Sequence, residues 1–196
     1  MLQTKVILSR VTNLSDARYA SGMGVDYIGF SINPKNSQYV TIEQAETISD
    51  WLSGVSIIAD IGDSVTTDIA EYAAAYIQTS NASLINELDV PILALDVNDV
   101  NINDVINTMA TSSADVSFFI LNVESELMSV LQPQLKELCR KYPIYISAEL
   151  DSQNLAFVLR DIKPTGIVLM GSTEEKPGFS SYDGIADILE QLEVEG

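Results

Sequence analysis

The stretch Ile7-Leu8-Ser9-Arg10-Val11-Thr12-Asn13-Leu14-Ser15-Asp16-Ala17 joins a short apolar strand directly to the start of a helix. Thr12 or Asn13 is expected to cap that helix, because the side-chain oxygens of such residues accept hydrogen bonds from the free amides of a first helical turn. Polar residues therefore gather where the carboxyl end of a strand meets a helix N-terminus. In α/β proteins, binding and catalytic groups usually lie at this place.

The same strand-then-helix unit recurs along the whole chain. Short apolar, β-branched runs predict eight strands, which are Lys5–Ser9, Tyr27–Ile32, Val55–Asp60, Tyr76–Gln78, Pro91–Val97, Val116–Asn122, Pro143–Ala148 and Gly166–Met170. Helices are expected at Leu14–Met23, Ile42–Leu52, Val65–Ala75, Leu84–Leu88, Asn103–Ala110, Leu127–Leu138, Leu155–Ile162 and Tyr182–Leu192. Pro133 is predicted to mark either a helix start or a kink.

Eight strands, each followed by a helix, predict an α/β fold of the (β/α)8 or TIM barrel class. The 196 residues fall slightly below the usual size of such barrels, roughly 200 to more than 400 residues, so we expect short loops and a single domain over residues 1–196. An open doubly wound sheet is the alternative. It is less favoured because Ser9-Arg10-Val11 replaces the glycine-rich turn that binds dinucleotides after a first strand.

Charge and composition limit the partners. The chain carries 28 Asp and Glu against 10 Lys and Arg, a formal charge of −18, which repels nucleic acid and acidic membrane surfaces. No hydrophobic run is long enough to cross a bilayer, and no basic leader precedes an apolar segment. We therefore expect a cytoplasmic protein without nucleic-acid or membrane partners.

The residue types present also limit the chemistry. The absence of histidine excludes Ser-His-Asp hydrolysis, Cys-His proteolysis and histidine metal sites. Cys139 is the only cysteine, so no disulfide forms within the chain, and its place beside an apolar helical stripe predicts a buried structural thiol. Acid–base chemistry is left to carboxylates, lysine, tyrosine or this thiol.

Several stretches resemble the phosphoribosylanthranilate isomerases of tryptophan biosynthesis, a family of small (β/α)8 barrels. The resemblance is carried by Thr12–Ala17 (family TNLEDA), Asp26–Phe30 (D-x-LGF), Pro34–Val40 (PKSPRYV), Gln78 (QLHG), Pro91–Val97 (VIKAFRV) and Gly166–Gly178 (GVDVSSGVE and PG). These stretches follow the family order over nearly the whole chain. The resemblance implies an aminoaldose–ketose isomerisation driven by a general acid and a general base, and we expect no cofactor.

The two catalytic positions that the resemblance implies hold different residues here. Ser9 stands at the position of the family's cysteine base, and a serine hydroxyl without a neighbouring base keeps its proton at working pH. Asn122 stands at the position of the aspartate acid, and its amide cannot deliver a proton. We predict that both positions are inactive.

The positions that would bind an anion have changed as well. Gln38 and Asp96 replace family arginines, and Glu149 lies in a loop where the family has glycines that approach a phosphate closely. A carboxylate there repels phosphate and adds bulk. Gly171 and Ser172 remain candidates to offer backbone amides to a phosphate. These five residues are the predicted ligand-binding positions.

Three functions stay open. The first is a degenerate barrel that binds a small molecule or a protein partner, as a monomer or a homodimer. The second is an active isomerase in which Ser9 or another group acts as base and Glu124 or Asp96 donates the proton. The third is a different small-molecule enzyme with an acidic mouth, where Asp60, Asp96 and Glu149 form a speculative Mg²⁺ or Ca²⁺ site. Solvated carboxylates without a metal are the simpler expectation.

Overall fold

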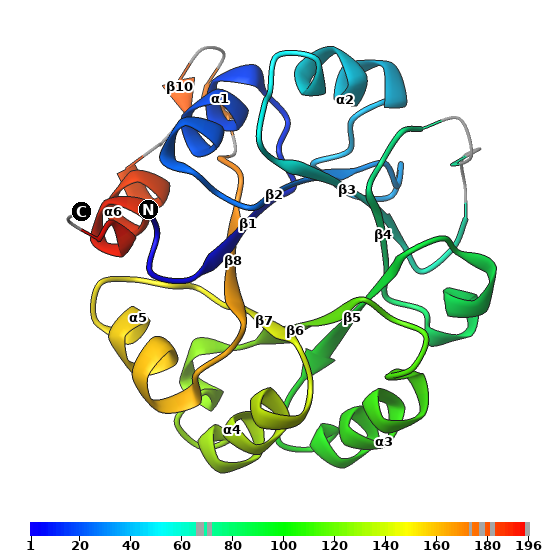
Figure 1. Cartoon of the computed structure of the whole chain (residues 1–196), viewed down its shortest axis with the longest axis vertical. Coiled ribbons are helices and arrows are strands. Elements are labelled where there is room, and N and C mark those ends of the chain that lie inside the picture. The colour runs from blue at the N-terminus through cyan, green and yellow to red at the C-terminus, as the bar shows by residue number, and fades with distance from the viewer. Residues whose placement is uncertain (66–68, 70–71, 173, 177–178, 181–182, 195–196) are drawn as a thin grey trace.

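Eight parallel strands pair in chain order, and the last pairs back with the first, so the sheet closes into a barrel. The computed structural model describes residues 1–65, 69, 72–172, 174–176, 179–180 and 183–194. The strands are β1 Lys5–Ser9, β2 Tyr27–Ser31, β3 Ser56–Gly62, β4 Tyr76–Thr79, β5 Pro91–Val97, β6 Phe118–Val123, β7 Ile144–Ser147 and β8 Gly166–Met170. The predicted (β/α)8 barrel is therefore confirmed (Figure 1).

Helices surround the barrel (Figure 1). They are α1 Leu14–Met23, α2 Ile42–Ser49, η2 Ala82–Glu87, α3 Ile102–Ser112, η3 Ser125–Leu127, α4 Gln132–Lys141, α5 Asn154–Phe157, η4 Val158–Ile162 and α6 Asp183–Leu192. A short hairpin, β9 Glu174–Lys176 with β10 Phe179–Ser180, follows β8 and was not predicted. The helix expected at Val65–Ala75 falls partly outside the described residues.

Local sequence explains where the helices begin and end. Asn13, rather than Thr12, caps α1, because its side chain accepts a hydrogen bond from the Asp16 amide at 2.9 Å. Thr41 and Gln44 form a reciprocal capping box at the start of α2. Pro133 lies in the first turn of α4, so it starts that helix and does not kink it. The segment expected as a helix at Leu84–Leu88 is a 3-10 helix instead.

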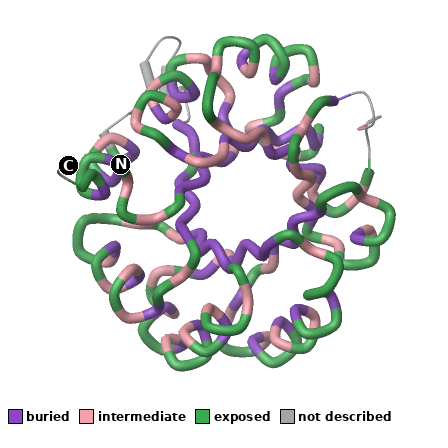
Figure 2. The backbone as a smooth tube through the Cα atoms, viewed as in Figure 1, coloured by how far each residue is buried: buried purple, intermediate pink, exposed green. Residues whose placement is uncertain are grey.

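Side chains fill the inside of the barrel. An inner cluster contains Ile7, Ile58, Ile92, Ala94, Phe118, Ile120, Tyr145 and Val168. Tyr27, Tyr76, Phe118 and Tyr145 form its aromatic floor, with ring centroids 4.7 to 5.9 Å apart. Figure 2 shows the strands as a buried ring inside more exposed helices. A ligand can therefore enter only at the ends of the barrel, and we call the end formed by the carboxyl ends of the strands the mouth.

The described part of the chain contains no helix with both the length and the hydrophobicity needed to cross a membrane. The chain ends lie beside each other on the barrel wall, since Leu2 bridges to Glu193 and the Val194 amide donates to the Met1 carbonyl at 3.0 Å. Lys5 is exposed at the amino end of β1, the end of the strand opposite the mouth.

Closure of the barrel requires glycine at position 166. A Cβ atom on Gly166 would collide with the Lys5 carbonyl and the Tyr145 ring. We expect Gly166→Ala to lower the free energy of unfolding by about 2 kcal/mol through overpacking. Gly22→Ala is the matched control, because nothing lies within 4 Å of its added methyl group and alanine favours the helix. Urea denaturation tests both variants, and equal stability of Gly166→Ala and the parent chain would contradict the prediction.

Candidate functional site

Three polar side chains lie next to each other at the carboxyl ends of β5, β6 and β7. Strand register pairs Asp96 with Asn122 and Asn122 with Ser147. The residues two positions earlier, Ala94 and Tyr145 among them, belong to the inner cluster, so alternation turns this row toward the mouth. We call Asp96, Asn122 and Ser147 the polar row.

One hydrogen bond orients the polar row. The Asn122 side chain donates through Nδ2 to Asp96 Oδ1 at 2.8 Å. Within the described residues, Asn122 Oδ1, Asp96 Oδ2 and Ser147 Oγ have no hydrogen-bond partner. The row therefore leaves three acceptor oxygens free, and its free donors are the second Nδ2 hydrogen of Asn122 and the Ser147 hydroxyl.

Two adjoining cavities open beside the polar row, and both are lined by the row and by Glu149. The larger one, about 700 Å³, extends to Arg10, Gly171 and Ser172 and to an apolar wall of Leu150, Leu169, Ile185 and Ile188. The smaller one, about 510 Å³, adds Glu124 and Glu126. Carboxylates thus outnumber the single guanidinium along the two linings.

Glu149 is held at the rim by its backbone. Its carbonyl accepts hydrogen bonds from Ser125 Oγ and Asn154 Nδ2, both at 2.8 Å. Its exposed carboxylate forms no hydrogen bond or ion pair with a described residue. The glycine-to-glutamate change noted in the sequence therefore adds a free negative charge to the mouth.

The amides predicted to bind phosphate after β8 already have partners. The Gly171 amide donates to the Ser9 carbonyl at 2.7 Å. The amide and hydroxyl of Ser172 both donate to Asp16 Oδ2 at 2.7 Å, and Asp16 is 1% exposed. A buried carboxylate thus takes the place expected for an external anion. This corrects the expectation that Gly171 and Ser172 offer free amides.

Ser9 lies at the end of β1 and is buried, and its hydroxyl forms no hydrogen bond within the described part of the chain. Strand β2 packs directly against it, since a Cβ on Gly29 would lie 3.4 Å from Ser9 Oγ. Among the described residues, no base accepts a hydrogen bond from this hydroxyl.

Gln38 and Arg10 connect the loops of the mouth. Gln38 Nε2 donates to the Arg10 carbonyl at 3.3 Å and the Gly171 carbonyl at 3.4 Å. Its donor group therefore contacts backbone in this structure and not the larger cavity. Arg10 has a left-handed backbone, φ 55°, and its side chain lines that cavity. Arg10 forms no ion pair with a described residue.

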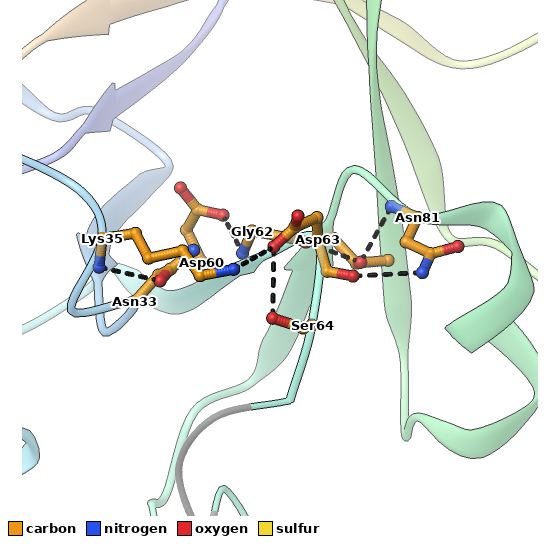
Figure 3. A network of polar contacts seen from close by, with 8 residues as sticks. Asn33, Lys35, Asp60, Gly62, Asp63, Ser64 and Asn81 are labelled. Carbon is orange, nitrogen blue, oxygen red and sulfur yellow. Dashed lines mark hydrogen bonds and ion pairs between the residues drawn. The ribbon is translucent and has the colours of Figure 1, made fainter.

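Asp60 lies at the end of β3, 7% exposed, and accepts a hydrogen bond from the Gly62 amide at 3.0 Å. Burial raises the pKa of its carboxyl, and the Gly62 amide and the charge of Arg10 oppose that rise. Figure 3 shows the neighbouring network, in which Asp63 pairs with Lys35 at 3.5 Å and accepts from Ser64. The Asp60 carboxylate is therefore held against the backbone at the carboxyl end of β3.

The speculative metal site does not form among the described residues. They contain no group of three or more Asp, Glu, Cys or His side chains that could hold a metal ion. Asp60 is held at β3 by the Gly62 amide, whereas Asp96 and Glu149 follow β5 and β7. Asp60 thus lines neither of the two cavities that Asp96 and Glu149 share.

Two residues of the mouth, Asp16 and Ser147, were not singled out from the sequence. Asp16 looked like an ordinary residue of a first helical turn, and Ser147 could have been found only as the inward residue two positions after Tyr145.

Cys139 packs against the core, and burial raises the pKa of its thiol to about 12. This agrees with the predicted structural thiol.

The raised pKa of Asp60 predicts a pH dependence of stability. Just above the ordinary aspartate pKa of about 3.9, the folded chain keeps a proton that the unfolded chain has lost. The free energy of unfolding therefore falls as pH rises through this range. Asp60→Asn keeps the acceptor for Gly62 and removes the titration, so we expect a smaller fall between pH 4 and pH 7 in urea denaturation.

Asp63→Asn is the control for Asp60→Asn. The Ser64 hydroxyl and Lys35 lower the pKa of Asp63, so its contribution to stability is lost as pH falls. Asp63→Asn should therefore reduce the loss of stability at low pH, whereas Asp60→Asn should reduce the loss of stability as pH rises. Parallel pH profiles for Asp60→Asn and the parent chain would contradict the prediction.

Asp16 should stabilise the chain through Ser172. Asp16→Ala leaves the Ser172 amide and hydroxyl without their acceptor, and we expect a loss of about 3 kcal/mol in the free energy of unfolding. Asp16→Asn keeps one acceptor oxygen, so its loss should be smaller. Thermal and urea denaturation compare the two variants. An equal loss of unfolding free energy in Asp16→Ala and Asp16→Asn would show that the side-chain acceptor for Ser172 does not stabilise the chain.

Comparison with known proteins supports one family. No family model matches the chain. It is 22% identical to N-(5'-phosphoribosyl)anthranilate isomerase of Chlorobium phaeovibrioides over 95% of each chain. It is 24% identical to the same isomerase of a Sulfurihydrogenibium species, over 92% of this chain and 94% of the relative.

Solved structures agree with these sequence relatives. Phosphoribosylanthranilate isomerase of Thermotoga maritima superposes with a TM-score of 0.78 at 19% identity, over 97% of this chain and 98% of the other. The isomerase of Pyrococcus furiosus gives a TM-score of 0.71 at 16% identity, with the same coverage of each chain. The chain is thus similar in sequence to phosphoribosylanthranilate isomerases over nearly its whole length, and it shares the (β/α)8 barrel of the solved isomerases.

Proposed function

We propose that this chain is an isomerase-like barrel that has lost the isomerase chemistry and binds a small molecule at its mouth. The state of the two family catalytic positions carries the proposal. The Ser9 hydroxyl has no base beside it, and the Asn122 amide is turned to Asp96 at 2.8 Å. Loss of one acid–base group typically lowers a rate by about 10²–10⁴, and here both groups are replaced.

The altered anion positions support the same proposal. The names of the relatives describe a phosphoribosyl substrate, which carries a phosphate. In this chain, Asp16 and Ser9 occupy the amides after β8, and Glu149 adds a negative charge after β7. Gly171 and Ser172, the described residues directly after β8, therefore offer a phosphate no free amide, and a carboxylate lies on the same cavity lining.

The mouth nevertheless keeps a cavity of ligand size. The larger cavity, about 700 Å³, falls within the range of roughly 300–1,000 Å³ of small-molecule sites. It combines an apolar wall with a few convergent polar groups, which is the usual composition of such sites. Binding therefore remains a function of this mouth.

An active isomerase with substitute residues is the second candidate. Glu124 and Asp96 were expected as proton donors, and both are exposed. One new observation favours this candidate, because burial raises the pKa of Asp60 and a general acid needs a carboxyl that keeps its proton. The base is still missing, so we place this candidate second.

Assembly and location belong to the same proposal. A phosphoribosylanthranilate isomerase of Thermotoga maritima is described as dimeric, and we infer that this chain is a monomer or a homodimer. A cytoplasmic location and the absence of a nucleic-acid partner stay predictions from the sequence and its charge.

The purified chain should not convert phosphoribosylanthranilate above the uncatalysed rate, because no residue at the family positions moves a proton. Chromatographic assay of product formation measures this, with the Thermotoga maritima isomerase as positive control. Complementation of an isomerase-deficient strain tests the same point in cells. Turnover that Asp60→Asn abolishes would establish the second candidate and overturn the first.

A further inference from the structure

The polar row offers the larger cavity three free hydrogen-bond acceptors, which are Asp96 Oδ2, Asn122 Oδ1 and Ser147 Oγ. Asn122 donates one Nδ2 hydrogen to Asp96 Oδ1, and its Oδ1 accepts no hydrogen bond from a described residue. Ser147 is 5% exposed, yet it lines both cavities and its hydroxyl has no partner within the described residues. The Ser147 hydroxyl is accessible from the cavity and is therefore free to bind a ligand group.

The charge around this hydroxyl favours a cation. Asp96 and Glu149 line both cavities, and Glu124 and Glu126 line the smaller one. None of these carboxylates forms a salt bridge among the described residues. Among the described lining residues, Arg10 is the only cationic side chain, and its charge also acts on Asp60. Described carboxylates therefore outnumber described cations beside the polar row.

The apolar part of the larger cavity indicates what kind of body a ligand has. Leu150, Leu169, Ile185 and Ile188 form an apolar wall in the same space. These residues come from β8, α6 and the loop after β7. A ligand that places a charge at the polar row can bury an apolar body against this wall.

We propose that the larger cavity binds a protonated primary amine with a compact apolar body. An ammonium group has three N–H donors and no acceptor, which complements Asp96 Oδ2, Asn122 Oδ1 and Ser147 Oγ. The apolar body contacts Leu169, Ile185 and Ile188. This inference rests on the proposed function, since it names the ligand class of the same mouth.

Calorimetric titration of the full chain at pH 7 tests the ligand class with three probes of similar shape. They are 2-phenylethylamine, 2-phenylethanol and phenylacetate. We expect the amine to bind at least about tenfold more tightly than the alcohol, because charge-assisted hydrogen bonds to the polar row are lost with the hydroxyl. Phenylacetate should show no binding. Equal binding of amine and alcohol, tighter binding of phenylacetate, or no heat with the amine would overturn the inference.

Variants test the position of the amine. Asp96→Asn should weaken amine binding about tenfold, and Ser147→Ala should weaken it by a smaller factor. Asp89→Asn is the matched control, because it removes the same charge from an exposed residue before β5, at the opposite end of the barrel. An equal effect of Asp89→Asn and Asp96→Asn would show a general charge effect and overturn the inference.

Two further readouts separate the possible failures. Thermal melting of each variant identifies loss of binding through unfolding. The isomerase assay on the same preparation tests the proposed function independently. Phenylacetate binding without isomerase activity would overturn the amine inference and leave the proposed function in place.

Discussion

Pairing of β1 with β8 is the constraint on which the rest of the molecule depends. The two strands run in register from Lys5 beside Gly166 to Ser9 beside Met170, and this contact turns an open sheet into a barrel. It also brings the loop after β8 next to the start of α1, where Asp16 accepts from Ser172. The pairing of β1 with β8 thus closes the barrel around the inner cluster. It also brings the loop after β8 and the loop before α1 together at the mouth.

Within that frame, the chemistry of the mouth is set by which polar groups already have partners inside the chain. Donors near the mouth are used internally: Gly171 and Ser172 donate to Ser9 and Asp16, and Gln38 donates to backbone carbonyls. Acceptors of the polar row remain free. A barrel whose relatives are named for a phosphorylated compound therefore presents an acceptor-rich, negatively charged cavity. One fold can carry sites of different chemistry.

Most of the fold was predictable from the sequence, for physical reasons. Lys5–Ser9, Pro91–Val97 and Gly166–Met170 coincide with β1, β5 and β8, because continuous apolar runs are required of strands buried on both faces. The 3-10 helix at Ala82–Glu87 and the π-helical turn at Val158–Ile162 were not predicted, since such short segments lack a distinctive period. Inward alternation placed Ser9 and Asn122 at the mouth, but no local pattern predicts a hydrogen bond between residues 156 positions apart.

The link between Asp16 and Ser172 has a consequence for biosynthesis of the chain. The carboxylate is synthesised before β2, whereas its partner is synthesised only after β8. Until then, Asp16 cannot be buried without an unpaired charge, which is strongly unfavourable. Burial of the α1 N-terminus is therefore coupled to addition of β8 and closure of the barrel.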